Sequence, residues 1–584
     1  MSSFIDISSH LTALLTYALR EALPDADTAL IDLDRPREAG HGDFSCSIAM
    51  KLSRSLRCQP RVLAQQIQAA LPPSLFIERT DIAGAGFLNI YLRPEAYQQI
   101  VPHILTLGER YGHNSLGHNN LGQQRSVQIE FVSANPTGPL HVGHGRGAAY
   151  GASLGNVLAA SGYRVSREYY VNDAGRQMDI LALSTWLRYL EACGESVTFP
   201  SNAYQGSYVR HMALAIFNQH GKRYLHAVDN VFASAPALSV DGDAHLDHLI
   251  AQTKRLLGVD YPYFHAFALN EQLNDCRNDL HEFGVEFDQW FSEQTLFDNG
   301  IVQRTLGVLA AHGHIYEQDG AQWFRSTRYG DEKDRVVQRD NGLYTYFASD
   351  IAYHLHKLER GFDWLIDIWG ADHHGYISRV KGALEALGRN PNQLTVALVQ
   401  FAVLYRDGQK AAMSTRSGEF VTLRELRAEV GNDAARFFYV LRKSEQHLDF
   451  DLDLARSRSN DNPVYYIQYA HARICSVLTQ WGGDPMALSA MDCSPLTSTH
   501  EIALLKQLVD YPVTVKAAAQ ELSPHLIAYA LKDIAAALHA YYNAQQFLLD
   551  DLPLRHARLA LIVATRTVLS NGLTMLGISA PTHM

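Results

Sequence analysis

The pattern of hydrophobic and polar residues is most informative between residues 126 and 161. Ser126 to Val132 alternates and is rich in β-branched residues, which is typical of a buried strand. Gly143 to Ser161 carries apolar residues at helical spacing, and the loop before it ends in His141-Val142-Gly143-His144. The pattern therefore predicts a strand, a loop and a helix that begins with two imidazoles.

Residues 1 to about 115 are predicted to form an α+β unit. Ser8 or Ser9 is expected to cap its first helix, and Gly86 to Leu92 alternates as a strand does. A Gly/Asn/Gln-rich stretch, 116–124, links this unit to the next. Between these elements, four basic residues recur at three- and four-residue steps, which predicts one side of a helix: Lys51, Arg54, Arg57 and Arg61. They form either a solvated face or a phosphate-binding surface.

Residues from about 125 to 455 are predicted to form a domain around a parallel sheet. The first strand, the helix and a second strand over Arg164 to Val171 make a β-α-β start. Trp364 to Trp369 and Leu394 to Leu404 are continuous apolar runs, as expected of buried parallel strands. The helical, aromatic-rich residues from about 190 to 330 contain no phosphate loop. A Rossmann-like sheet split by an insertion is the simplest interpretation.

Residues from about 460 to 584 have helical periodicity throughout, and Asn571-Gly572 is expected to end the last helix. They predict a helical bundle. The predicted fold class is thus α/β, with a Rossmann-like parallel-sheet catalytic domain that carries an insertion, an N-terminal α+β domain and a C-terminal all-α bundle.

Composition narrows the class of protein and the cellular compartment expected for this chain. A length of 584 residues suggests about three or four domains, and 47% apolar with 19% charged residues is typical of a soluble globular protein. The six cysteines are scattered without a C-x-x-C pair, which favours reduced cytoplasmic thiols and argues against structural zinc. No apolar run reaches transmembrane length, and Asp6 stands where a secretory leader would carry a cation. The net charge of −11 neither supports nor excludes RNA binding.

The helix start at His141 suits phosphate chemistry. Unpaired N–H groups and the positive end of the helix dipole attract anions, and the imidazoles add donors. Gly143 has no Cβ and would let a purine approach the backbone. The alternative is two surface histidines at a helix start. The His-x-Gly-His pattern is similar to the nucleotide-binding mark of class I aminoacyl-tRNA synthetases and their nucleotidylyltransferase relatives.

Further segments resemble arginyl-tRNA synthetases of the bacterial type. They follow the family's order over nearly the whole chain, at residues 130–158, 169–178 (YYVNDAGRQM), 344–354 (YTYFASDIAYH), 370–376 (GADHHGY), 412–423 (AMSTRSGEFVTL), 462–473 (NPVYYIQYAHAR) and 569–581 (LSNGLTMLGISAP). The resemblance implies ATP-dependent ligation of L-arginine to its tRNA through an arginyl-adenylate, with release of pyrophosphate and AMP.

An arginine pocket must meet a planar cation with five donors, which opposed carboxylates do well. Tyr346 and Asp350 lie four residues apart and share a face if their segment is helical. The resemblance places both toward the guanidinium, and Glu130 and Asn135 toward the α-amino end. The alternatives are a helix-start charge at Asp350 and an N-cap or loop-bridging carboxylate at Glu130. Because a buried carboxylate rejects neutral citrulline, no editing domain is expected.

The resemblance also implies an ATP site with Mg²⁺ and no zinc. Its catalytic and ATP-binding histidines are His141 and His144, with Gly143 under the adenine. Asp372 and His373 are expected to contact the ATP ribose or a loop rather than a metal, although a metal role is the alternative.

The mobile Lys-Met-Ser-Lys-Ser loop of class I enzymes matches residues 412–416. Met413 and Ser414 are retained and expected to contact ATP, but Thr415 stands where the catalytic lysine normally does. Lys410 or Arg416 must then supply the catalytic cation.

In the family, the N-terminal unit touches the tRNA elbow and the C-terminal bundle reads the anticodon. The implied partners are L-arginine, ATP and arginine-accepting tRNA, with no DNA and no membrane, for a cytoplasmic monomer that needs tRNA even to activate arginine. One rival interpretation is a smaller-substrate nucleotidylyltransferase, which leaves the flanking units without a purpose. The other is a synthetase-like RNA-binding protein that has lost catalysis, which only the missing loop lysines support.

Overall fold

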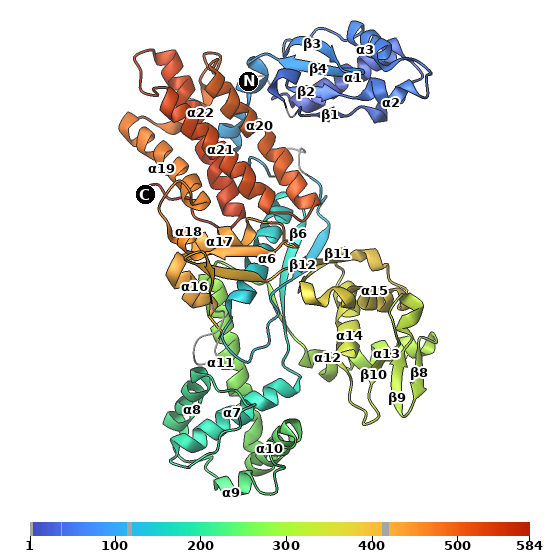
Figure 1. Ribbon diagram of the computed structural model, residues 1–584, viewed down its shortest axis with the longest axis vertical. Coiled ribbons are helices and arrows are strands. Elements are labelled where there is room, and N and C mark those ends of the chain that lie inside the picture. Colours follow the sequence, from blue (N-terminus) through green and yellow to red (C-terminus); the bar gives the residue numbers. More distant parts are fainter. Residues whose placement is uncertain (1–3, 37, 114–119, 412–419) are drawn as a thin grey trace.

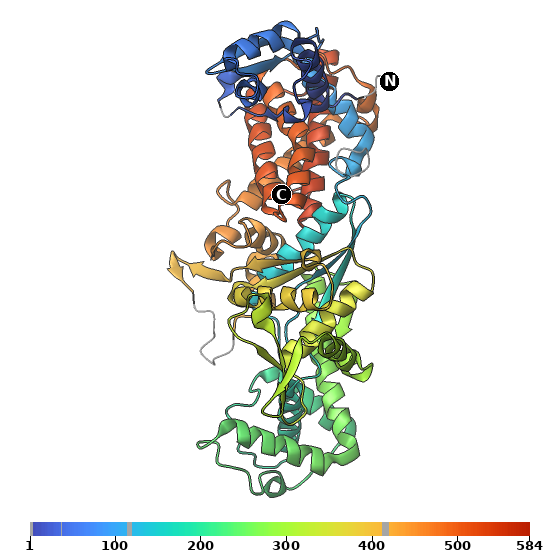
Figure 2. The same cartoon turned by 90° about the vertical axis from the view of Figure 1, so that its right-hand side faces the viewer.

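The computed structural model describes residues 4–36, 38–113, 120–411 and 420–584. The molecule is elongated (Figures 1 and 2). A C-terminal helical bundle forms one end with the N-terminal unit beside it, a parallel sheet lies in the middle, and a group of helices forms the other end. The predicted fold class is confirmed.

The N-terminal unit packs three helices against an antiparallel sheet of order β1-β2-β4-β3. Asp6 caps its first helix, because its carboxylate accepts the Ser9 N–H at 2.9 Å, so the predicted serine cap is wrong. The elements are α1 (Ile7–Ala22), β1 (Leu33–Asp34), β2 (Phe44–Cys46), α2 (Ile48–Ser53), α3 (Pro60–Ala69), β3 (Ile77–Ala83) and β4 (Phe87–Leu92), followed by α4 (Glu95–Gln98) and α5 (Ile100–Leu107).

The four basic residues of this unit do not share one helix. Lys51 lies in α2 and Arg54 at its C-cap, whereas Arg57 has a φ of 50° in the following turn and Arg61 lies in α3. Pro60 starts α3. Because proline lacks an N–H and disfavours a helical conformation at the residue before it, α2 cannot run on through Pro60 into α3. The predicted common helix face is therefore wrong.

The central sheet has five parallel strands in the order β12-β11-β5-β6-β7. The two central strands, β5 and β11, have buried interiors, as strands covered on both faces require, whereas the flanking strands are partly exposed. Helix α6 (Val142–Ala160) connects β5 to β6, and α14 (Tyr346–Glu359) precedes β11. The strands are β5 (Ser126–Glu130), β6 (Arg164–Val171), β7 (Gln289–Ser292), β11 (Trp364–Gly370) and β12 (Leu394–Val399).

The span expected as one insertion contains β7 of the central sheet, so the chain leaves this sheet twice. The first excursion is helical: α7 (Arg176–Ala192), α8 (Ser207–His220), α9 (Val228–Val231), α10 (Gly242–Leu257) and α11 (Tyr261–Glu282). The second holds a small antiparallel sheet of order β10-β9-β8. Its elements are α12 (Gln294–Asp298), α13 (Ile301–Ala311), β8 (Ile315–Gln318), β9 (Ala321–Phe324) and β10 (Arg335–Gln338).

The apolar run Leu394 to Leu404 is not one strand. Only β12 joins the central sheet, and β13 (Ala402–Arg406) pairs instead with β14 (Gln409–Lys410) and β15 (Leu448–Asp451). The break lies at Gln400, whose N–H bonds to the Ser444 carbonyl at 2.9 Å. Continuous hydrophobicity cannot reveal a change of sheet. Helices α15 (Ile377–Ala386), α16 (Leu423–Val430), α17 (Asn432–Val440) and α18 (Leu452–Arg456) complete this part.

The C-terminal bundle consists of α19 (Pro463–Trp481), α20 (Thr499–Gln520), α21 (His525–Ala544) and α22 (Leu552–Met575). Asn571-Gly572 does not end α22. The Asn571 amide is buried and donates to the Gly108 and Tyr111 carbonyls at 3.1 Å, while the helix continues to Met575. Over the described ranges, we find no helix with the length and apolarity needed to cross a membrane.

Candidate active site

The predicted histidine pair lies at the carboxyl edge of the central sheet. The strand order reverses between β5 and β11, and ligands of such sheets bind outside the carboxyl ends of the strands at this switch point. His141 is the N-cap of α6, immediately after the loop that follows β5. The predicted nucleotide-binding motif thus lies at the edge where sheets of this kind bind ligands.

The two imidazoles are oriented by the backbone around them. His141 Nδ1 accepts the Gly143 N–H at 3.1 Å, and His144 Nδ1 accepts the His141 N–H at 3.2 Å. Because an accepting Nδ1 carries no proton, the proton of each neutral ring is on Nε2. Burial lowers the pKa of His141, and burial together with His141 lowers the pKa of His144 to about 3. Both rings are therefore neutral donors at physiological pH.

Gly143 leaves an open approach to this helix start. A Cβ there would lie 2.8 Å from the His141 ring and 3.7 Å from the Phe401 ring. The half-exposed Phe401 side chain and the missing Cβ leave a surface against which a flat base can lie.

The chain that follows the predicted mobile loop returns to the histidine pair. The Val142 N–H bonds to the Val421 carbonyl at 3.0 Å, and the Leu423 N–H bonds to the Leu140 carbonyl at 2.8 Å. Lys410 ends β14 on the other side of the loop and is exposed. The predicted residues Met413, Ser414 and Arg416, with Thr415, lie outside the described residues.

At the same carboxyl edge of the sheet, a cavity of about 350 Å³ opens between β5, β6, β11 and α14. Three carboxylates line it, from Glu130, Glu293 and Asp350. Its described lining contains no lysine or arginine, and the other polar residues are Ser133, Tyr170, Asn172, Tyr346, Tyr353, His354, His373 and Tyr376. The cavity is suited to a small cation.

Helix α14 presents the two residues predicted for a guanidinium. Asp350 and Tyr346 both line the cavity, as their four-residue spacing predicted, with Tyr346 60% exposed at its edge. The Tyr376 hydroxyl donates to the Asp350 carboxylate. Burial raises the pKa of Asp350, and the Tyr376 hydrogen bond opposes that rise.

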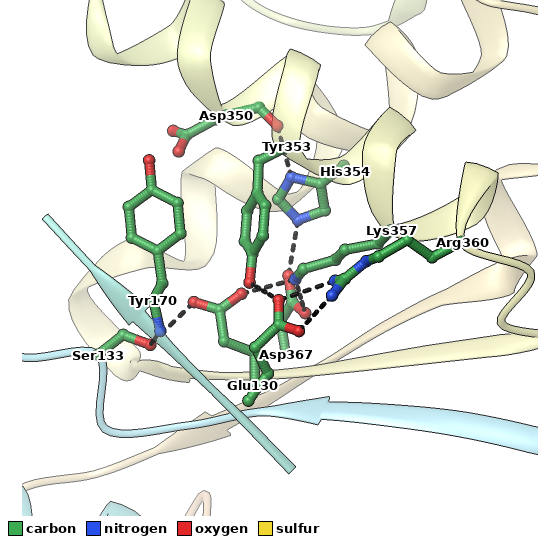
Figure 3. Close-up of polar contacts among 10 residues, drawn as sticks. Glu130, Ser133, Tyr170, Asp350, Tyr353, His354, Lys357, Arg360 and Asp367 are labelled. Atoms are coloured by element: carbon green, nitrogen blue, oxygen red, sulfur yellow. Dashed lines mark hydrogen bonds and ion pairs between the residues drawn. The ribbon is translucent and has the colours of Figure 1, made fainter. Parts of the chain in front are cut away.

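Glu130 ends β5 on the opposite side of the cavity. Its Oε2 is 2.6 Å from Lys357 Nζ, and its Oε1 accepts the Ser133 hydroxyl at 3.0 Å (Figure 3). Burial raises the pKa of Glu130, and Lys357 acts in the other direction. The carboxylate is thus anchored within the sheet and is not a helix cap.

The remaining predicted residues are more scattered. Asn135 is exposed on the loop after β5 and does not belong to the cavity lining. His373 lies at the cavity, while Asp372 beside it is 62% exposed in the turn after β11. Within the described ranges, no cluster of at least three His, Cys, Asp or Glu residues could hold a metal ion. The four basic residues of the N-terminal unit lie elsewhere, on the exposed surface around the turn between α2 and α3.

Sequence reasoning missed Glu293, whose side chain is buried beside Tyr170 and Ser349. It follows β7, a four-residue strand inside the span interpreted as insertion. The available signal was a carboxylate two residues after a short apolar run, Trp290 and Phe291. It becomes meaningful only once that run is placed in the sheet.

Comparison with known proteins matches three family models in succession. These are "Arginyl tRNA synthetase N terminal domain" over residues 9–92, "tRNA synthetases class I (R), catalytic domain" over 106–211 and 270–448, and "DALR anticodon binding domain" over 467–584. The catalytic match omits residues 212–269, which lie in the helical excursion.

Individual relatives point to the same family as these models. The chain is 61% identical over 580 residues to an arginine-tRNA ligase of Nitrosospira multiformis, with 99% of each chain covered. It is 60% identical to that of Azoarcus sp., covering 98% of this chain and 99% of the relative. The arginyl-tRNA synthetase structure of Thermus thermophilus has the same fold, with a TM-score of 0.71 at 23% identity, covering 99% of this chain and 100% of that one.

Proposed function

This chain belongs to the arginyl-tRNA synthetase family, and on that premise we propose that it joins L-arginine to its cognate tRNA in two ATP-driven steps. The arginine carboxylate first attacks the α-phosphate of ATP, giving arginyl-adenylate and pyrophosphate. A ribose hydroxyl at the tRNA terminus then takes the arginyl group and releases AMP.

The charge balance of the cavity carries the proposal for arginine. Beneath the cavity, Lys357 pairs with the carboxylates of Glu130 and Asp367, and Asp367 also contacts the His354 ring. Asp350 and Glu293 form no ion pair with any described residue, although both are buried around the pocket. Burying charge without a partner is costly, so a ligand with two cationic groups fits this site. Arginine has its guanidinium and its α-amino group.

The geometry also favours arginine over its nearest analogues. Asp350 and Tyr346 on α14 face Glu130 on β5 across the cavity, which suits a planar group with donors in a fixed fork. Lysine has the charge without the fork. Citrulline has the shape without the charge, and it would leave a buried carboxylate unpaired. Binding alone can then reach discrimination of about ten-thousand-fold, and no editing domain is needed.

For the first step, positioning and charge stabilisation are the main requirements, because the attacking carboxylate is already an anion. The Nε2–H groups of His141 and His144 would donate to phosphate oxygens, supported by the positive end of the α6 dipole. Gly143 would lie under the adenine. Mg²⁺ would arrive with the triphosphate as part of the substrate, in keeping with its preference for phosphate oxygens and water.

The catalytic cation would come from the end of β14 or from the segment between β14 and α16. We assign it to Lys410 or Arg416, since Thr415 replaces the usual lysine. Met413 and Ser414 would contact ATP, and Asp372 and His373 the ribose or this segment. The backbone bonds between 421–423 and 140–142 support closure of the segment over the histidine pair.

The flanking units would bind tRNA, with the N-terminal domain (residues 1–115) at the elbow and the bundle (460–584) at the anticodon, around a catalytic domain of 125–455. The DALR match supports the second assignment. We further propose a cytoplasmic monomer without zinc and without DNA or membrane partners. In the protein without ligand, Asn135 does not line the arginine pocket.

Aminoacylation tests this function directly. Labelled arginine, MgATP and arginine-accepting tRNA should give acid-precipitable arginyl-tRNA, whereas tRNA for another amino acid should give none. Adenylate transfer without any need for tRNA would favour a nucleotidylyltransferase. Binding of tRNA without either product would favour an RNA-binding protein.

A further inference from the structure

A fully buried lysine lies directly beneath the acidic cavity. Lys357 is 0% exposed, and its Nζ is 2.6 Å from Glu130 Oε2 and 2.8 Å from Asp367 Oδ1. Figure 3 shows it reaching from α14 between the two carboxylates. Although burial works to lower it, Asp367 and Glu130 raise the pKa of Lys357. Lys357 is therefore a buried cation separated from the cavity by Glu130, which lines the cavity wall.

Histidine 354 extends this arrangement along α14. His354 Nδ1 faces the Asp350 carbonyl at 2.7 Å, and its Nε2 faces Asp367 Oδ2 at 2.6 Å. The ring therefore lies between two oxygen atoms, one from its own helix and one from β11. Asp350, His354 and Lys357 follow at steps of four and three, so they share one helix face. One continuous set of contacts thus joins the helix that carries Asp350 to the strand that carries Glu130.

A second buried ion pair lies nearby without reaching the cavity. Arg360 Nη1 is 2.6 Å from Glu168 Oε2, and neither residue lines the pocket. Buried ion pairs are weak contributors to stability compared with apolar packing, so stability alone does not explain Lys357. What distinguishes the Lys357 pair is that its carboxylate, Glu130, is part of the pocket wall.

We propose that Lys357 is a positioning residue for arginine, which holds the Glu130 carboxylate charged and in one place. Glu130 Oε2 is taken up by Lys357, while Oε1, which accepts the Ser133 hydroxyl, keeps a lone pair for a cationic group of the ligand. This role rests on the proposed binding of arginine in the cavity. Lys357 does not itself touch the substrate.

Removing the lysine would leave two carboxylates facing one another. Like charges at such distances cannot both stay ionised in a buried site, and one proton is retained near neutral pH. The charged and titratable groups around Glu130 are Tyr353, His354 and Lys357 from α14, Asp367 from β11, and Glu168 and Tyr170 from β6. Only Lys357 forms an ion pair with Glu130 among the described residues.

The test compares arginine KM and kcat in tRNA-dependent aminoacylation between pH 6 and 8.5. The variants are K357M and the double variant K357M/D367N, which removes the lysine together with one carboxylate. The second keeps the buried charge balanced and carries the test if K357M does not fold. The matched control is R360M/E168Q, which removes a buried ion pair from the same region. Thermal unfolding of each variant is recorded.

We expect the Lys357 variants to raise arginine KM about ten- to hundredfold at pH 7 while kcat changes much less. In K357M, arginine KM should fall as pH rises, because Glu130 regains its charge. The control should lose stability with an arginine KM within about twofold of wild type. For the wild-type enzyme, a KM that does not change between pH 6.5 and 8 is expected.

An unchanged KM in a folded Lys357 variant overturns the positioning role, and so does an equal KM rise in the control. A wild-type KM that climbs steeply below pH 7.5 overturns it without any variant, because Glu130 would then not be held charged. Absence of arginine-dependent activity in the wild-type enzyme is a separate outcome that rejects the proposed function itself.

Discussion

At the scale of single residues, environment decides what each group of the site can do. Asp350 and Glu293 are buried carboxylates that form no ion pair with a residue in the described part of the chain, and His141 and His144 are imidazoles held neutral. The sequence could identify Asp350 and the histidines, because they fall in recognisable spacings. It could not identify Glu293, whose role depends on which strand pairs with β6.

Replacing Asp350 by asparagine should raise arginine KM about ten- to hundredfold, since a charge-assisted hydrogen bond in a buried site is lost. Citrulline binds the wild type weakly because it leaves the Asp350 carboxylate unpaired. Asparagine carries no charge, so citrulline should compete better with arginine in the variant than in the wild type. Steady-state aminoacylation with citrulline as inhibitor measures both. The control is Asp319→Asn in the exposed turn between β8 and β9, which should behave as wild type. Equal arginine KM in D350N and wild type would remove Asp350 from the pocket.

His144→Asn keeps an acceptor for the His141 N–H but removes the Nε2 donor. We expect kcat to fall about 10²- to 10³-fold with little change in arginine KM.

The pH profile of kcat in the wild type provides a second readout on the histidines. Burial lowers the pKa of both rings from the ordinary value of 6.5, so both are neutral above that pH, and kcat should not fall as pH rises from 6.5 to 8. A loss of kcat through that range would mean that an imidazolium acts in the reaction.

At the scale of elements, local pattern predicted the type of most helices and strands but not their partners. The strand Arg164–Val171 was predicted with the bounds that the structure has. Leu394 to Leu404 was divided between two sheets, and the basic run broke at Pro60, because pairing and turn geometry are set by distant residues. Asn571-Gly572 continues a helix because tertiary hydrogen bonds hold Asn571 inside the bundle.

Helix α6 contains two glycines with opposite surroundings, one crowded and one open. A Cβ at Gly151 would lie 2.4 Å from the Phe131 ring, whereas one at Gly147 meets nothing within 4 Å. Gly151→Ala should cost about 1–3 kcal/mol of unfolding free energy by pushing the helix from the sheet. Gly147→Ala should gain up to about 1 kcal/mol from helix propensity. Thermal unfolding compares the two, and a stable G151A would show that α6 does not pack tightly on β5.

The buried side chain of Arg146 on α6 forms hydrogen bonds with the segments that follow β12 and α17. Its guanidinium donates to the carbonyls of Gln400, Gln446 and Lys443 at 2.7 to 2.9 Å. Arg146→Met should lower the unfolding free energy by about 3 kcal/mol, since it leaves buried acceptors without donors. The exposed Arg255→Met on α10 serves as the control, with no change expected. Equal melting temperatures would contradict a structural role for Arg146.

At the scale of the whole molecule, the N-terminal unit is fixed to the helical bundle. Arg35 pairs with Asp510, and Lys506 Nζ is 2.5 Å from Asp43 Oδ1. The Tyr111 hydroxyl also donates to the Leu508 carbonyl at 2.7 Å. The molecule is long (Figure 2), and the cavity lies at the parallel sheet in its middle, which suits a substrate that extends to its end, as tRNA does.

The exposed turn after α2 should contribute to that contact. Lys51 is paired with Asp32 and Arg61 donates to the Gly84 carbonyl, which leaves Arg54 and Arg57 as the better phosphate ligands. R54A/R57A should raise tRNA KM about three- to tenfold, reduce its salt dependence and leave arginine KM unchanged. An unaltered tRNA KM at two salt concentrations would favour the interpretation as a solvated face.

We propose an arginine-specific ligase whose activation step depends on tRNA. Its most direct measurement is exchange of pyrophosphate into ATP, with and without arginine-accepting tRNA, using arginine, lysine and citrulline in turn. The proposed function predicts exchange with arginine and tRNA together, and none with lysine or citrulline. No exchange under any of these conditions, in a folded protein that binds tRNA, would contradict it.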